Sequence, residues 1–404
     1  MPVRTIEAKT GLTKGMFPEP FLISLYRAQA PYRGCAHGCR YCDGRAEKYY
    51  VDGDFETDIC VRGNLPELVA SDVALGTAAR EYGAVCIGSG VTDVYQPIER
   101  ELRLTRRTIE ALIPARLPII ILTKNDLILR DFDLLAQFPK ALVIFTVTAI
   151  DPAVARILEP RASPPEARLA AVRKAKEAGF FSGILAMPLC PGISDTEANT
   201  EDLFASGVAD FIYPGGLTLR PGRQKDLFLS LVEENFPELA PLYADVYREN
   251  RQSGMPLASY TAPKGKKWNS RLKVLRIPQM IPHRVYRELL SPPDSLFVLL
   301  SHMQSLYANK SVDTRPLKEA TGRYGSWLKE NRSALRRKRI PLLASDPFPI
   351  TRVLTEKLDA LCRREGGFES VCGNARLSAL VSSLIKDGTV FDYPTLTAGG
   401  RTDS

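Results

Sequence analysis

Residues 35–42 read Cys35-Ala-His-Gly-Cys39-Arg-Tyr-Cys42, a CxxxCxxC spacing that follows the first apolar run of the chain. Three cysteines within eight residues can bring three thiolates to one metal centre. Zinc and iron–sulfur sites usually take four protein ligands, so three cysteines leave one coordination position open, as a catalytic centre needs. The spacing therefore predicts a metal centre with an open position rather than part of a disulfide framework.

The chain around and after the cysteines alternates between short apolar runs and longer amphipathic segments. The apolar runs are rich in Ile, Val and Leu, as is typical of parallel strands buried on both faces. We expect strands at residues 21–26, 84–89, 118–123, 141–148, 181–188 and 209–213, and helices at 65–82, 98–113, 126–138, 165–178 and 197–206. This order predicts an α/β fold, a partial (βα)6 barrel of the TIM type, whose chemistry lies at the carboxyl ends of the strands.

The composition is that of an ordinary globular protein, with 404 residues, 45% of them hydrophobic and 25% charged. It excludes a disordered, collagenous or disulfide-stapled chain. The longest apolar runs, 117–122 and 141–147, are far shorter than a membrane span, and the N-terminus lacks the apolar core of a signal peptide. Eight cysteines with this clustering suit a reducing compartment. We therefore expect a cytoplasmic protein without a membrane partner.

The charge is concentrated in one part of the chain. Residues 261–340 hold 18 Lys or Arg against five Asp or Glu, so this segment is +13 while the whole chain is +8 and the remainder is −5. Both tryptophans, Trp268 and Trp327, lie in the segment. Cations neutralise phosphates and exposed aromatic rings stack on bases, so nucleic-acid binding is one interpretation. The alternatives are docking of the basic segment on the acidic remainder, or another anionic partner.

The change in composition also indicates a domain boundary. We expect an N-terminal extension at 1–20, a barrel at 21–253 and a basic, mostly helical C-terminal domain at 254–404. Residues 253–267 have the Gly, Pro and Lys content of a connector, and helices are expected at 296–309, 316–339, 350–364 and 375–387.

With an aromatic residue, Tyr41, directly before the last cysteine, the motif resembles that of the radical SAM enzymes. The resemblance implies a [4Fe–4S] cluster held by Cys35, Cys39 and Cys42, with S-adenosylmethionine (SAM) on the fourth iron. One electron would cleave SAM to methionine and a 5′-deoxyadenosyl radical, and a donor such as flavodoxin or ferredoxin would supply it. The alternative is a structural zinc site of the three cysteines and His37, which does not account for the strand–helix units that follow.

Further segments resemble the spore photoproduct lyase-like branch of the radical SAM proteins, over roughly residues 20–235. In chain order they are Gly88-Ser89-Gly90-Val91-Thr92-Asp93-Val94-Tyr95-Gln96-Pro97, Thr123-Lys124, Glu159-Pro160-Arg161 and Met187-Pro188-Leu189-Cys190-Pro191-Gly192.

The resemblance implies that residues at these strand ends contact SAM. They are Tyr41 over the adenine, Gly88, Ser89 and Gly90 near the amino group and methionyl part, Thr92, Lys124 on the carboxylate, and Thr146 at the barrel mouth. Arg161 is a further candidate for holding an anion, or for a structural pair with Glu159. For each of these residues, local packing or a surface role is the alternative.

One position departs from the branch. Spore photoproduct lyases carry a hydrogen-donating cysteine where this chain has Gly90, so the lyase reaction is not implied as that family runs it. Cys190 is a candidate hydrogen donor and Tyr95 a candidate radical relay, with packing as the alternative for both.

Together these observations predict a radical SAM enzyme that abstracts a hydrogen atom from a nucleic acid or nucleotide. A radical SAM enzyme for a protein or small metabolite is the first alternative. A nucleic-acid-binding protein with a structural metal site is the second.

Overall fold

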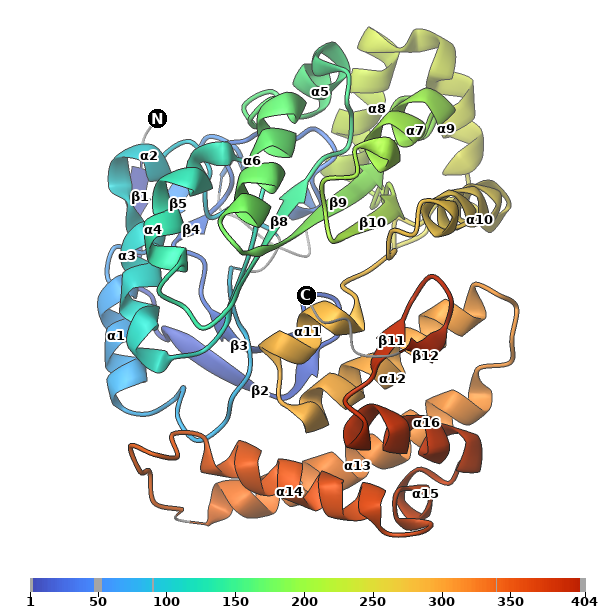
Figure 1. Ribbon diagram of the computed structural model, residues 1–404. Helices are drawn as coiled ribbons and strands as arrows, with labels where there is room; N and C mark the ends of the chain where they lie inside the picture. The colour runs from blue at the N-terminus through green and yellow to red at the C-terminus, as the bar shows by residue number, and fades with distance from the viewer. Residues whose placement is uncertain (1–2, 47–52, 89–90, 339, 400–404) are drawn as a thin grey trace.

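The computed structural model describes residues 3–46, 53–88, 91–338 and 340–399. A seven-stranded sheet with the order β10-β9-β8-β7-β6-β3-β2 forms its centre (Figure 1). Its strands are β2 (Leu12–Glu19), β3 (Ser24–Ala28), β6 (Val85–Ile87), β7 (Ile119–Thr123), β8 (Ala141–Thr146), β9 (Phe181–Leu189) and β10 (Phe211–Gly216). In this sheet β3, β6, β7, β8, β9 and β10 run parallel to one another, so the six expected strands and the α/β class are confirmed.

The register brings the carboxyl ends of the parallel strands to one edge of the sheet. Tyr26 pairs with Val85, Val85 with Ile119, and Ile119 with Ala141, so these four residues form one row across four strands. The loops that leave the strands therefore meet at a common edge, where the first expected site residues lie. The sheet stays open, with β10 and β2 as its two ends.

Helices cover the outer face of this sheet. They are α1 (Leu65–Ala74), α3 (Leu104–Leu112), α4 (Phe132–Leu135), α6 (Pro165–Glu177) and α7 (Glu197–Ala205), while α2 (Glu99–Leu102) and α5 (Pro152–Leu158) lie outside the core on this face. Alternate strand residues such as Ile121, Val143 and Ile184 share a core with apolar residues of α3 and α6. This in–out alternation places Ile120, Leu142, Ile144 and Leu185 on the opposite, inner face.

The C-terminal helices pack on that inner face. They follow α8 (Arg223–Asn235), α9 (Ala240–Val246) and α10 (Ala258–Val274) and are α11 (His283–Leu289), α12 (Pro292–Ala308), α13 (Arg315–Arg337), α14 (Pro349–Arg363), α15 (Gly367–Cys372) and α16 (Ala375–Lys386). Apolar residues of α11 to α16 form one core with the inner residues of β7, β8 and β9. The helical C-terminal region is confirmed, and its removal would expose the sheet to water.

A buried ion network joins the C-terminal helices to the first strands. The Arg332 guanidinium of α13 lies 2.7 Å from the Asp294 carboxylate and 2.9 Å from Glu81, and all three side chains are buried. Arg332 also donates to the carbonyl oxygen of Met16 in β2 at 2.5 Å. Lys14 and Arg336 contact Glu81 as well, at 3.1 and 2.7 Å.

Three local expectations were wrong. Residues 1–20 are not a separate extension, because β1 (Val3–Thr5) pairs with β5 (Ile59–Val61) and β2 pairs antiparallel with β3. The helix expected at 98–113 breaks at Arg103, whose φ is 52°. The connector expected at 253–267 lies largely in α10, because Trp268 and Leu272 pack into the core of the sheet's outer face.

Within the described part of the chain, no helix combines the length and the hydropathy needed to cross a bilayer.

Candidate radical SAM site

The three motif cysteines lie on one loop between β4 (Tyr32–Arg33) and the short helix η1 (Asp43–Arg45). Cys35 and Cys39 are buried, Cys42 is half-buried, and all three thiols are free. Burial raises the pKa of each thiol, to about 12 for Cys35. Bare thiolates are therefore unfavourable here, whereas a bound metal centre would stabilise the deprotonated sulfurs.

Hydrogen bonds from distant elements fix the shape of this loop. The backbone N–H of Ala36 donates to the Gln96 side chain at 2.8 Å, and that of Arg40 donates to the Leu158 carbonyl at 2.8 Å. Gly38 has φ +68°, and a Cβ there would lie 2.6 Å from a Glu56 carboxylate oxygen. Glycine is therefore required at the turn between the first two cysteines.

His37 is part of this support rather than a metal ligand. Its Nδ1 lies 3.0 Å from the carbonyl oxygen of Arg161, and its Nε2 lies 3.2 Å from the Asp93 carboxylate. Both ring nitrogens are thus engaged, which removes the fourth ligand of the structural zinc alternative. Among the described residues, the motif cysteines included, no three His, Cys, Asp or Glu side chains are placed to hold one metal ion. The cysteines of a [4Fe–4S] cluster would each bind a different iron, so this finding argues against a single zinc ion and not against a cluster.

Asp93 connects the cysteine loop to the strand ends. Its carboxylate accepts hydrogen bonds from the Thr123 hydroxyl at 2.8 Å and from the Lys124 N–H at 2.7 Å. Burial opposes its charge, but His37 and the hydrogen bonds lower the pKa of Asp93 to about 2. Sequence reasoning did not single out Asp93 or His37 as a pair, because 56 residues separate them.

Gly88, Lys124 and Thr146 follow the inner face of three adjacent strands. Side chains of a strand alternate between its two faces, so residues two or four positions apart share a face. Gly88, Lys124 and Thr146 stand at this spacing from the inner-face residues Cys86 in β6, Ile120 in β7 and Ile144 in β8. The three residues therefore lie on one face at the carboxyl edge of the sheet. Gly88 has φ +85°, which only glycine adopts without strain.

The Lys124 ammonium lies 5.9 Å from the centre of the Tyr41 ring. Burial opposes its charge, but Cys39 and Glu159 outweigh burial and raise the pKa of Lys124. No carboxylate of the described residues lies within 4 Å of this ammonium. Lys124 therefore brings a cation beside the cysteine loop that is available to an anionic ligand group.

Tyr41 is held by a buried acid. Its hydroxyl donates to Glu159, which is paired with Arg168 at 2.6 Å and accepts from the Thr148 hydroxyl at 3.3 Å. Glu159 therefore pairs with Arg168, not with Arg161 as one reading of the sequence suggested. The Arg161 guanidinium instead donates to the carbonyl oxygen of Ala36 in the cysteine loop.

Thr92 also supports the loop, since its hydroxyl donates to the Gly34 carbonyl. Gly34, Gly88 and Thr92 line a cavity of about 290 Å³ beside Cys35. Ser89 and Gly90, two further expected SAM contacts, lie outside the described residues.

The two candidate radical residues lie in different environments. The Tyr95 hydroxyl donates to Asp131 at 3.0 Å, within the core that joins the outer helices. Cys190 is buried in the same apolar cluster as Cys39 and Tyr41. Neither placement tests a radical role, and both remain predictions.

Part of the basic segment 261–340 is paired with the rest of the chain. Its cations contact carboxylates outside the segment at Glu81, Asp195, Glu197, Glu201 and Asp210. Trp268 is only 8% exposed, and the half-buried Trp327 stacks on the buried Tyr324. These rings are therefore not free platforms for bases, and docking on the acidic remainder involves six of the segment's cations, Lys264, Lys267, Arg271, Arg284, Arg332 and Arg336.

Comparison with known proteins identifies the family. The family model of the radical SAM superfamily matches residues 30–204. An uncharacterized protein of Methanocaldococcus jannaschii is 30% identical over 208 residues, which cover 51% of this chain and 75% of that protein. An uncharacterized protein of Mycobacterium tuberculosis is 31% identical over 231 residues, or 54% of this chain and 66% of the relative.

Solved structures give weaker similarities. Spore photoproduct lyase complexed with dinucleoside spore photoproduct has a TM-score of 0.42 and 16% identity, over 58% of this chain and 66% of that chain. A radical SAM methyltransferase from Sphaerobacter thermophilus has a TM-score of 0.34 and 18% identity, over 52% of this chain and 63% of that chain.

The chain belongs to the radical SAM superfamily. Members of this superfamily use a [4Fe–4S] cluster and SAM. The residues present fit that cluster, because the loop offers three free thiols and its only histidine is engaged elsewhere.

Proposed function

We propose that this protein is a radical SAM enzyme whose cluster is held by Cys35, Cys39 and Cys42. The observation that supports it is the set of three free thiols beside the Lys124 ammonium, at the carboxyl edge of a parallel sheet. A bound cluster supplies the electron that cleaves SAM to methionine and a 5′-deoxyadenosyl radical. The electron comes from outside the chain, and a reduced flavodoxin or ferredoxin in the cytoplasm is the proposed source.

The protein's own residues position and shield the reactants. Lys124 binds the SAM carboxylate, and Gly88 lets the backbone approach the methionyl part closely. The α11–α16 core closes the inner face of the sheet below these residues and keeps water from it. Asp93 and Glu159 hold the cysteine loop and Tyr41 through the contacts described above.

Anaerobic reconstitution tests this proposal. The expected protein is brown, binds four irons, bleaches with dithionite and then forms 5′-deoxyadenosine from SAM. Cys39→Ala should remove the colour, while Cys372→Ala, which deletes a buried thiol in α15, should keep it. A colourless, zinc-containing wild-type protein that forms no 5′-deoxyadenosine would contradict the proposal.

We further propose a nucleic acid or nucleotide as substrate. The support is the resemblance of the strand-end segments to the spore photoproduct lyase-like branch, together with the cations of residues 261–340 that remain unpaired. A protein or small-metabolite substrate is the alternative. Incubation of the reduced holoenzyme with SAM and oligonucleotides, nucleotides or peptides separates the two, because only a true substrate raises 5′-deoxyadenosine formation above its uncoupled rate.

A further inference from the structure

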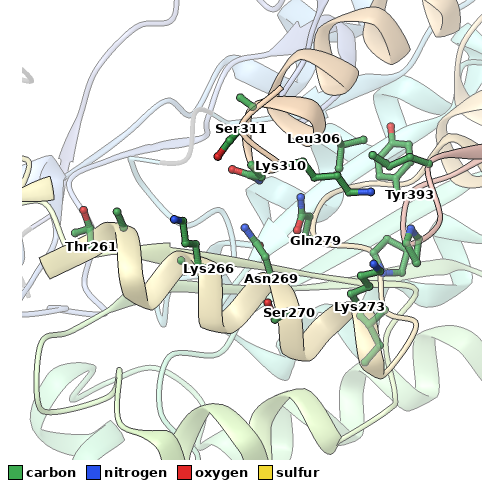
Figure 2. Close-up of a pocket in the computed structure, with 18 residues that line it drawn as sticks. Thr261, Lys266, Asn269, Ser270, Lys273, Gln279, Leu306, Lys310, Ser311 and Tyr393 are labelled. Atoms are coloured by element: carbon green, nitrogen blue, oxygen red, sulfur yellow. The ribbon is translucent and has the colours of Figure 1, made fainter. Parts of the chain in front are cut away.

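A cleft of about 650 Å³ lies between α10 and the C-terminal helices, and no residue of the cysteine loop is among the described residues that line it. One wall is α10, and the other is formed by residues 277–279, the end of α12 with residues 308–311, and residues 393–396. Figure 2 shows Lys266 and Asn269 on α10 opposite Gln279, Lys310 and Ser311. The volume is that of an ordinary ligand site.

The lining of the cleft is basic. Lys266, Lys273 and Lys310 contribute three positive charges, and the described residues that line the cleft include no Asp or Glu. All three lysines are exposed, and no carboxylate of the described chain lies within 4 Å of their ammonium groups. Like charges that face each other across a cleft repel, so the lysines favour a bound anion.

The other face of α10 shows that this is not a general property of the helix. Lys264, Lys267 and Arg271 contact Asp195, Glu197 and Glu201 at 3.2, 2.8 and 2.6 Å. Positions 264, 267 and 271 form one stripe along the helix, and 266, 269 and 273 form another. The first stripe docks on the acidic remainder of the chain, whereas the second remains without acidic partners.

Neutral donors accompany the lysines. The side chains of Asn269 and Gln279 line the cleft, and neither makes a hydrogen bond to another described residue. Ammonium and amide donors together suit phosphate oxygens, which accept several hydrogen bonds and are negatively charged. Lys266 and Lys273 lie two helical turns apart, about 10 Å, so an extended ligand can contact both.

We infer that this cleft binds a phosphate-bearing ligand, either a free nucleotide or a strand of nucleic acid. Recognition is through phosphates, because the one aromatic side chain among the described lining residues, Tyr393, is buried and hydrogen-bonded to Tyr286 and His302. Binding here does not require SAM cleavage. The role of the ligand as substrate does rest on the proposed function.

Fluorescence anisotropy on the reconstituted protein tests the site, with a labelled 12-nucleotide single strand as probe and ATP as competitor. Three lysine contacts to a single strand predict a log–log salt slope of about −2, or about 20-fold weaker binding between about 50 and 200 mM salt. The variant Lys266→Gln/Lys273→Gln/Lys310→Gln should lose this slope and weaken binding at low salt by at least 20-fold.

A matched variant removes three charges from the same basic segment but outside the cleft. Lys267→Gln/Lys318→Gln/Lys329→Gln changes exposed lysines of α10 and α13 and should keep the slope and most of the affinity. Competition by ATP identifies a free nucleotide as a ligand, and binding of the strand alone identifies nucleic acid. The inference would be overturned if neither probe bound, or if the two triple variants lost probe affinity equally.

The same titration on Cys39→Ala separates this inference from the proposed function. Cys39→Ala should bind the probe like the wild type although it forms no 5′-deoxyadenosine. Thermal unfolding of each variant shows that the fold is retained, since every substituted lysine is exposed.

Discussion

Replacing Arg332 by methionine should destabilise the whole chain, because this guanidinium neutralises two buried carboxylates. Arg332, Asp294 and Glu81 have side chains 1% or less exposed. The variant removes the guanidinium paired with Asp294, removes one of the three cations at Glu81 and deprives the Met16 carbonyl of a donor. Breaking a buried ion pair in this way costs about 3–5 kcal/mol, a large part of the 5–15 kcal/mol that stabilises a typical domain.

Urea unfolding, followed by tryptophan fluorescence and circular dichroism, measures the loss. Arg337→Met is the matched control, because Arg337 lies on the same helix but is exposed and should change stability by less than about 0.5 kcal/mol. The loss in free energy of unfolding of Arg332→Met/Glu81→Gln should be smaller than the sum of the losses of the two single variants, since the double variant leaves one buried charge fewer.

The loss should also depend on pH. Arg336, Arg332 and Lys14 outweigh burial and lower the pKa of Glu81 in the folded protein. Its stabilising contribution is therefore present above the pKa of the unfolded chain, about 4.3, and disappears as pH falls through the lower folded value. The difference in free energy of unfolding between wild type and Arg332→Met should become smaller below about pH 4. A deficit under 1 kcal/mol at pH 7, or one that does not narrow in acid, would refute the reasoning.

Three further predictions concern the site. Gly38→Ala forces a side chain into a positive-φ turn and should lower iron incorporation several-fold. Gly63→Ala places its side chain in open space and should not lower it. Equal iron content in the two variants would be inconsistent with a strained turn at Gly38. Lys124→Met should weaken SAM binding by about 10–100-fold with the cluster retained, and unchanged affinity in a SAM titration would exclude the carboxylate contact. Tyr95→Phe should cost about 1 kcal/mol from its bond to Asp131 and leave 5′-deoxyadenosine formation unchanged; loss of that activity at full iron content would instead support a radical relay.

The repeated apolar runs predicted the parallel sheet because strands buried on both faces leave a clear hydrophobic signal. The same principle failed for α10, where Pro263 and Gly265 suggested a connector. Tertiary packing of Trp268 and Leu272 overrides that local preference. β2 was missed because its pairing partner, β3, decides its place, and a single strand carries no mark of its partner.

For the site, the cysteines and Lys124 could be found from motifs that are contiguous in the chain. The hydrogen bonds and ion pairs that hold the cysteine loop could not be found in this way. Tyr41 and Glu159 are 118 residues apart, and Arg332 meets Glu81 across 251 residues. Charge counting showed that residues 261–340 are basic but not which lysines are paired, since that depends on which face of α10 meets α7.

The measurement that tests the central claim most directly is the electron paramagnetic resonance spectrum of the dithionite-reduced protein, with and without SAM. Three thiolates from Cys35, Cys39 and Cys42 leave the fourth iron open to SAM, so addition of SAM should change the cluster signal. Lys124→Met should need a higher SAM concentration for the same change. A reduced wild-type protein with no cluster signal, or with one that SAM does not alter, would contradict the account.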